Sequence, residues 1–233
     1  MIRVLGLGDR AAWIDAWSRC GREPFAHPDY VALFATDGAT AIALHDGQDG
    51  GEVLLPLVRR PLPGGVALPG AGWSDAVSPY GYGGPYRCGD VDWPGFYERL
   101  LAWMRDTQVL TAFVRGDIAT TPPALDALPG YRAAVLADNV RVDLSRSEDE
   151  QWRHYAHKVR KNVNKARRAG LTVRITEGFV DLAAFVDIYR STMERRQAHE
   201  RYFFDHAFFK RVGGIEGAAL VADVLDGDRV VST

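Results

Sequence analysis

The same order of expected elements occurs twice along this chain of 233 residues, and the repeat limits the possible folds more than any other feature. Hydrophobic spacing and turn residues in residues 1–60 predict a strand, two helices, a strand, a turn and a strand. Residues 171–233 predict the same series. The mixture of helices and strands in each copy indicates an α/β protein with two related domains and mixed sheets.

The first copy continues beyond its repeat into a longer series of elements, which assigns residues 1–146 to the first domain. Its helices carry apolar residues at helical spacing, and its strands are extended runs between turn residues. The expected elements are a strand Met1–Leu5, a helix Asp9–Cys20, a helix from Pro28, strands Thr40–His45 and Glu52–Arg59, an extended run Val66–Leu68, a helix Trp93–Asp106, and strands Val109–Arg115 and Asn139–Leu144.

The second domain, residues 147–233, begins with one long helix. Ser147 and Glu150 form a capping box, and Gly170 ends the helix. The elements expected after it are a strand Leu171–Thr176, a helix Phe179–Ala198, a short helix from Asp205, and a hairpin of Ala218–Leu225 with Arg229–Thr233. A chain that ends inside a hairpin leaves an open sheet edge, so we expect this domain to be incomplete at its C-terminus.

Positive charge is concentrated at the start of the second domain. Residues 151–176 hold eight Lys or Arg and no Asp or Glu, although the whole chain carries a net charge of −2. An uncancelled basic helix suits a phosphate-bearing ligand, such as a nucleotide-linked sugar, a polyprenyl pyrophosphate or a tRNA acceptor stem. A solvated basic face is the alternative. The candidate anion-binding residues are Lys158, Arg160, Lys161 and Lys165.

A second candidate site is the glycine- and tyrosine-rich stretch Ser78–Pro85, which lacks apolar periodicity. Gly81, Gly83 and Gly84 let a backbone approach a ligand, while Tyr80 and Tyr82 offer aromatic faces and hydroxyl groups. The alternative is a tight structural turn.

Other candidate residues are weaker. Arg195 also suits the C-terminus of a helix, and Tyr202 belongs to an aromatic cluster that is more typical of a core. The spacing of His, Asp, Ser and Cys identifies no catalytic residue and no metal site. Two cysteines, and the absence of a signal peptide or a long apolar run, favour a cytoplasmic protein.

Three stretches resemble the FemAB-like branch of the GNAT acyltransferase superfamily, which includes peptidoglycan bridge-forming aminoacyltransferases and related acetyltransferases. They are SPYGYGGP (Ser78–Pro85), HKVRKNVNKARRAGLTV (His157–Val173) and IYRSTMERRQAHERYFFDHAFFKRV (Ile188–Val212). The resemblance implies tandem GNAT-like domains, of which the second lacks the part that binds the donor pyrophosphate. It also implies that the Ser78–Pro85 loop and the basic helix face one cleft.

The reaction implied by the resemblance is the attack of an amine on an activated acyl group. The donor is an acyl-CoA or an aminoacyl-tRNA, used as a co-substrate, with no bound cofactor and no metal. The acceptor is an anionic, nucleotide- or lipid-linked cell-wall precursor or a related sugar or peptide, reached from the inner membrane surface. The alternatives are an acyl-CoA-dependent N-acetyltransferase of polysaccharide or small-molecule biosynthesis, and a non-catalytic module that binds RNA or another anion.

Overall fold

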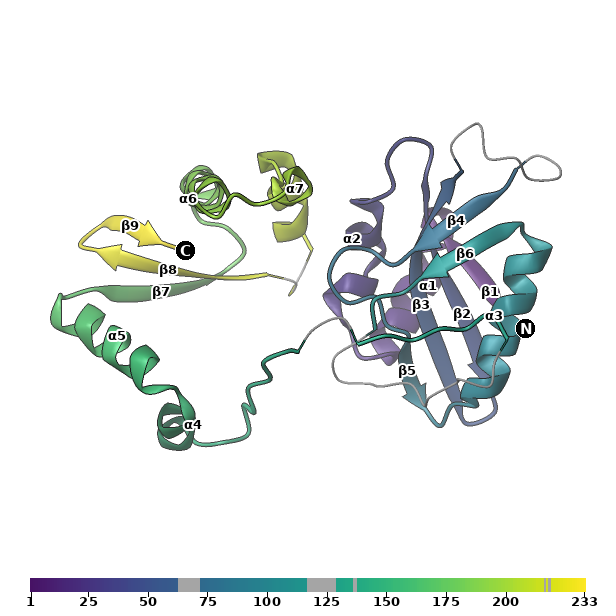
Figure 1. The fold of residues 1–233 in the computed structure, drawn as a ribbon, viewed down its shortest axis with the longest axis horizontal. Coiled ribbons are helices and arrows are strands. Elements are labelled where there is room, and N and C mark those ends of the chain that lie inside the picture. Colours follow the sequence, from purple (N-terminus) through teal and green to yellow (C-terminus); the bar gives the residue numbers. More distant parts are fainter. Residues whose placement is uncertain (63–71, 117–128, 136–137, 216, 218) are drawn as a thin grey trace. The chain divides into compact units, whose positions relative to one another are not determined.

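The computed structural model describes residues 1–62, 72–116, 129–135, 138–215, 217 and 219–233. The chain forms two compact units, Met1–Leu136 and Ala137–Thr233 (Figure 1). The first unit holds a six-stranded mixed sheet and the second a three-stranded antiparallel sheet, so the predicted α/β class is confirmed. Within the described ranges, no helix combines the length and the apolar character needed to cross a bilayer.

The sheet of the first unit has the strand order β1-β2-β3-β4-β6, and β5 also pairs with β3. Only β4 and β6 are parallel among the described pairs, because α3 connects them as a crossover helix. The elements are β1 (Arg3–Gly6), α1 (Arg10–Arg19), α2 (Pro28–Ala32), β2 (Thr40–Gln48), β3 (Gly51–Pro61), β4 (Ser74–Val77), β5 (Tyr86–Gly89), α3 (Trp93–Asp106) and β6 (Val109–Phe113), with single 3-10 turns at Leu7–Asp9 and Pro24–Ala26.

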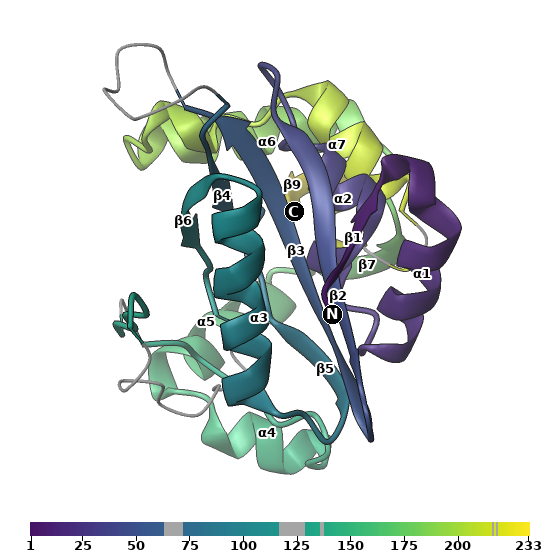
Figure 2. The same ribbon diagram turned by 90° about the vertical axis from the view of Figure 1, so that its right-hand side faces the viewer.

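Helices cover both faces of this sheet. Trp13 and Trp17 recur at helical spacing on α1 and are buried in one apolar cluster with residues of β2 and β3. Phe96 and Leu100 of α3 are buried in a second cluster on the opposite face (Figure 2). The described residues of the first unit therefore form a three-layer arrangement with a core on each side of the sheet.

The second unit has a smaller core. Val186 of α6, Phe209 of α7 and Val221 of β8 are buried, and both helices lie on the same side of the sheet (Figure 1). Strand register places Val173 and Ile175 on the face opposite to Val221, where they are 63% and 67% exposed. The elements are α4 (Glu148–His154), α5 (His157–Arg168), β7 (Thr172–Glu177), α6 (Leu182–Arg195), α7 (His206–Gly213), β8 (Leu220–Asp226) and β9 (Arg229–Ser232), with a 3-10 turn at Glu200–Tyr202.

The repeat expected from the sequence is confirmed in its order of elements. Each copy runs strand, helix, helix, strand, strand, and the strands pair antiparallel as β1-β2-β3 and as β7-β8-β9. The two hairpins also match, since Asp226 and Gly227 reverse the chain between β8 and β9 as predicted. The two units therefore share this order of elements and this strand pairing.

The strand predicted at Asn139–Leu144 is wrong. This segment has no strand partner among the described residues, and Val140 and Leu144 are 88% and 79% exposed. Alternating apolar residues predict a strand only where a sheet edge accepts their backbone hydrogen bonds. The run predicted at Val66–Leu68 lies outside the described residues.

The long helix predicted from Ser147 to Gly170 is divided into α4 and α5. The capping box of Ser147 and Glu150 is present and starts α4. Tyr155 and Ala156 then adopt extended backbone angles, so α5 starts a new helical axis at His157. Trp152 and Tyr155 consequently lie outside α5. The four-residue strands β4 and β5 were not expected from the sequence.

Candidate functional site

The Ser78–Pro85 loop lies beside β3, at the point where the strand paired with β3 changes from β4 to β5. Strand β3 pairs with β4 through Val58–Pro61 and with β5 through Gly51–Leu54. The loop joins β4 to β5 and passes the intervening Leu55–Leu57 segment. It therefore lies at the carboxyl end of the parallel pair β4 and β6, a position at which α/β sheets commonly bind ligands.

Two tyrosine hydroxyls fix the main chain of this loop. The hydroxyl of Tyr30 donates to the carbonyl of Tyr80 over 3.0 Å, and that of Tyr86 donates to the carbonyl of Tyr82 over 2.5 Å. Burial, assisted by the neighbouring Tyr80, raises the pKa of Tyr30, which keeps its hydroxyl protonated as a donor. The ring of Phe25 packs edge-on against Tyr82 at 5.7 Å between centroids.

The three glycines of the loop each face atoms of the first unit. An added Cβ would lie 2.4 Å from the Phe25 ring at Gly81, 2.0 Å from the Ser78 Cβ at Gly83, and 2.8 Å from the Tyr86 amide nitrogen at Gly84. Gly81 and Gly84 also have positive φ angles, which favour glycine. Internal packing therefore accounts for all three glycines without a ligand.

Tyr80 is the loop residue that presents its side chain most openly. It is 44% exposed, and the guanidinium of Arg115 lies 5.9 Å from the centre of its ring. Arg115 lies two residues after the end of β6 and was not among the residues expected to bind a ligand. The signal available in the sequence was an arginine at the carboxyl end of the expected strand Val109–Arg115, immediately before Gly116.

Helix α5 displays the predicted basic side chains of the second unit. None of its residues is buried, and none of its basic side chains forms an ion pair with another described residue. The guanidinium of Arg167 lies 5.3 Å from the ring of Trp152. The helix carries six cations: Lys158, Arg160, Lys161, Lys165, Arg167 and Arg168.

Arg160 differs from the other cations of α5. Its side chain is only partly exposed, and its Nε atom is shielded from solvent with no hydrogen-bond acceptor in the described part of the chain. Leaving a buried donor unsatisfied costs about 1–3 kcal/mol, and more for a charged group.

The two weaker candidates make contacts within the second unit. Arg195 is the last residue of α6, and its Nη2 lies 3.5 Å from the hydroxyl oxygen of Thr192. Tyr202 accepts a hydrogen bond from Arg201 at its hydroxyl, over 2.9 Å, and another from the Tyr189 hydroxyl at its carbonyl. These contacts tie Tyr202 to neighbouring residues of the second unit, and its role in substrate binding stays a prediction.

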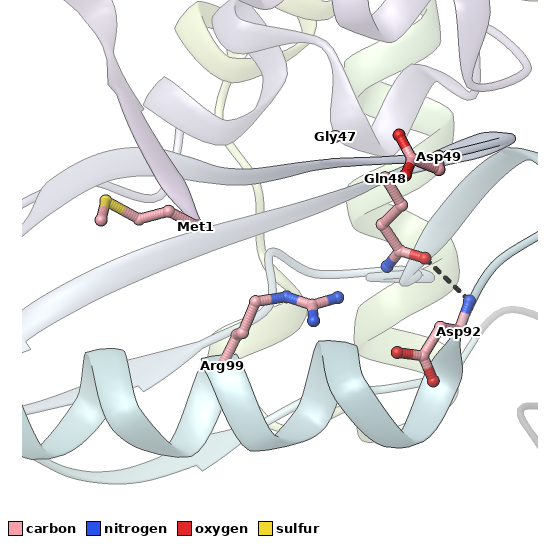
Figure 3. Close-up of a pocket in the computed structure, with 6 residues that line it drawn as sticks. All are labelled: Met1, Gly47, Gln48, Asp49, Asp92 and Arg99. Atoms are coloured by element: carbon pink, nitrogen blue, oxygen red, sulfur yellow. Dashed lines mark hydrogen bonds between the residues drawn. The ribbon is translucent and has the colours of Figure 1, made fainter.

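A pocket of about 340 Å³ lies elsewhere in the first unit (Figure 3). Arg99 points into it, but its charge is compensated by the fully buried Asp46, at 2.8 Å. Gln48 accepts a hydrogen bond from the amide of Asp92 across the pocket, over 2.7 Å. Its lining is Met1, Gly47, Gln48, Asp49, Asp92 and Arg99, none of which was a candidate. The acidic side chains make it a poor site for an anionic ligand.

The candidate residues thus form two groups, each within its own unit. Tyr80 and Tyr82 lie in the loop of the first unit, while Lys158, Arg160 and Lys161 lie on α5 of the second. The expectation that both groups face one cleft stays a prediction. Among the described residues, no group of three or more His, Cys, Asp or Glu side chains is placed to hold a metal ion.

Comparison with known proteins supports the class of the second unit. Residues 130–212 match the model of the FemAB family, a GNAT-like aminoacyltransferase family. The resemblance seen in the sequence is therefore confirmed over this segment, which includes α4, α5, β7, α6 and α7. None of the curated proteins matches the chain.

Proposed function

We propose that this protein transfers an acyl or aminoacyl group to an amine of an anionic cell-wall precursor or a related sugar or peptide. The amine nitrogen attacks the carbonyl carbon of an aminoacyl-tRNA ester or an acyl-CoA thioester. An amide bond forms, the C–O or C–S bond breaks, and the amine proton passes to solvent or to the leaving group. The FemAB match over residues 130–212 supports this reaction class.

The observation that carries the proposal is the placement of positive charge at the start of α5. Lys158 lies in the first turn of α5, where the helix dipole disfavours a cation, and Arg160 and Lys161 follow in the second turn. Ala156 provides no side-chain cap, so nothing acidic offsets the charge there. Helix stability therefore does not explain these residues, whereas binding of a phosphate group does.

Arg160 makes the argument specific to one side chain. Its shielded Nε atom lacks an acceptor within the described residues, although exposed lysines beside it are solvated. We propose that Arg160 hydrogen-bonds a phosphate oxygen of the acceptor, while Lys158, Lys161 and Lys165 supply the surrounding positive field. A nucleotide-linked or lipid-linked precursor provides that phosphate. A cytoplasmic enzyme would meet the first in solution and the second at the inner membrane surface.

Transferase activity is tested by supplying both donor classes to the full chain. The assay contains an amine-bearing, diphosphate-linked peptidoglycan precursor with either a mixed pool of aminoacyl-tRNAs or acetyl-CoA, and mass spectrometry detects the new amide. Transfer from aminoacyl-tRNA supports the leading proposal. Transfer only from acetyl-CoA supports an N-acetyltransferase instead, and binding of RNA or precursor without any transfer supports a non-catalytic module.

The role of α5 is tested in the same assay by K158Q/K161Q/K165Q and by R160Q. We expect the triple variant to weaken precursor binding about tenfold or more and to flatten its salt dependence. Lys210, an exposed lysine of α7, provides the matched control K210Q. Unchanged affinity and an unchanged salt slope in the folded triple variant would show that α5 is only a solvated basic face.

A further inference from the structure

The parallel strands of the first unit end near Arg115, which forms no ion pair with another described residue. Val77 and Phe113 end β4 and β6, and the chain continues from them into the Ser78 loop and into Arg115. The amide of Ser78 donates to the Phe113 carbonyl over 2.9 Å. Both chain continuations are therefore held side by side at the carboxyl edge of the parallel pair.

Hydrogen bonds on both sides fix the main chain of Arg115. Its amide donates to the hydroxyl oxygen of Ser78 over 3.0 Å, and its carbonyl accepts from the amide of Gly83 over 2.7 Å. The position of its Cα is therefore determined by the loop, even though its side chain is exposed. A fixed backbone reduces the conformational entropy that ligand binding must offset.

The side chain of Arg115 is oriented by an aromatic ring and not by a carboxylate. Its guanidinium lies over Tyr80 at 5.9 Å, and it forms no ion pair within the described ranges. Other arginines of this unit are compensated, such as Arg60 by Asp75 and Arg99 by Asp46. No described carboxylate occupies the N–H donors of the Arg115 guanidinium, which can bind an oxyanion in bidentate geometry.

We infer that Arg115, supported by Tyr80, binds a phosphate of a diphosphate-linked ligand at the carboxyl edge of β4 and β6. The choice of a diphosphate rests on the proposed function, whereas the location rests on the geometry of the first unit. This site is separate in sequence and in unit from the cations of α5. Arg115 acts as a binding and positioning residue, with no role in proton transfer.

The inference is tested by calorimetric titration of the full chain with inorganic pyrophosphate. The K158Q/R160Q/K161Q/K165Q variant serves as background, so that α5 does not obscure binding to the first unit. We expect R115Q to weaken the pyrophosphate binding that remains in this background about tenfold or more. R115K should retain part of that binding, because Lys keeps the positive charge but lacks the paired donors of a guanidinium. Arg105, an exposed residue in the last turn of α3, gives the matched control R105Q.

Two further arms identify the source of the diphosphate. Uridine diphosphate represents nucleotide-linked ligands, and geranyl diphosphate represents lipid-linked ones. If one of these two ligands binds more tightly than pyrophosphate, and both R115Q and Y80L abolish that gain in affinity, the ligand belongs to the class which that compound represents. Y80L leaves the Arg115 charge in place, so it also tests the site if R115Q fails to fold.

Failure of this inference is distinguishable from failure of the proposed function. The Arg115 site is overturned if the K158Q/R160Q/K161Q/K165Q variant does not bind pyrophosphate, or if adding R115Q leaves that binding unchanged. This holds even if the wild-type chain transfers acyl groups. Binding that depends on Arg115 in a chain with no transfer from either donor leaves the site standing and overturns the proposed reaction.

Discussion

Replacement of Gly83 by alanine tests whether the loop glycines serve internal packing or a ligand. Gly83 is buried, and an alanine Cβ would lie 2.0 Å from the Ser78 Cβ and 2.5 Å from the Ser78 Oγ. Real Cβ atoms do not approach so closely, so Ser78 or the loop has to move. Movement of Ser78 also removes the acceptor of the Arg115 amide.

The expected cost of G83A follows from these two contacts. Overpacking of a dense region costs about 1–3 kcal/mol. Loss of the Ser78 acceptor costs about 1–3 kcal/mol if the Arg115 amide stays unsatisfied. Gly83 does not have a positive φ angle, so alanine restricts the unfolded chain and recovers about 0.4–1 kcal/mol. Because the two losses share Ser78, they do not add fully, and we expect a net destabilisation of about 2–3 kcal/mol.

The assay is urea unfolding followed by tryptophan fluorescence. Trp152 is the only one of the six tryptophans that lies in the second unit, so the signal mainly reports the first unit. Gly8 is exposed, has no atom within 4 Å of an added Cβ, and provides the control G8A, for which we expect a change within about 0.5 kcal/mol. S78G removes the clashing Cβ, so S78G/G83A should be less destabilised than the sum of its single variants.

Two results would refute this reasoning. G83A could unfold at the same urea concentration as G8A, or the S78G and G83A effects could add without coupling. Either result would mean that the Ser78 contact does not require a glycine. If such a stable G83A chain also lost pyrophosphate binding, Gly83 would be assigned to close approach of a ligand instead.

Two further predictions concern the other side of the first unit. The hydrogen bond from Arg19, assisted by one from His45, lowers the pKa of Glu52, so its stabilising effect is present above the ordinary Glu pKa and is lost as the pH falls through the folded value. We therefore expect E52Q to destabilise the chain by about 2 kcal/mol at pH 7 in urea titrations. The difference from wild type should narrow as the pH falls below the ordinary Glu pKa, and a difference that stays constant would contradict the linkage. Burial raises the pKa of the Cys20 thiol to about 12, whereas Cys88 is exposed. Iodoacetamide at neutral pH should therefore modify only Cys88 in the native chain, and modification of native Cys20 at a similar rate, seen by mass spectrometry, would contradict its burial.

Elements with strong local signals could be predicted from the sequence. The helix expected at Trp93–Asp106 has those bounds in α3, because Asp92 caps it and apolar residues recur at helical spacing. The hairpin around Asp226 and Gly227 is equally local. Such features depend on neighbouring residues alone, so one sequence is sufficient to specify them.

Features that depend on distant partners could not be predicted in this way. Asn139–Leu144 has a clear alternating pattern, but a strand also requires an accepting edge, which no sequence pattern reveals. The interruption at Tyr155 and Ala156 has neither Gly nor Pro to mark it. Likewise, a glycine-rich stretch indicates close approach of something, and only the structure shows that Phe25, Ser78 and Tyr86 are the neighbours.

The two candidate anion-binding groups differ in what they are able to contribute to the proposed reaction. The cations of α5 lie on an exposed helix, so they act over several ångströms and are screened by salt. The main chain of Arg115 is held by a hydrogen bond to Ser78 and one from Gly83, so Arg115 can fix the orientation of a bound oxyanion. Amide formation between two bound substrates depends on holding the amine at the carbonyl carbon, for which attraction alone is insufficient. In our proposal, α5 therefore governs how strongly and how fast the second unit attracts an anion, whereas the loop and Arg115 govern how an anion bound to the first unit is oriented. Because screening weakens the first contribution more than the second, salt should affect substrate capture more than turnover of the bound complex.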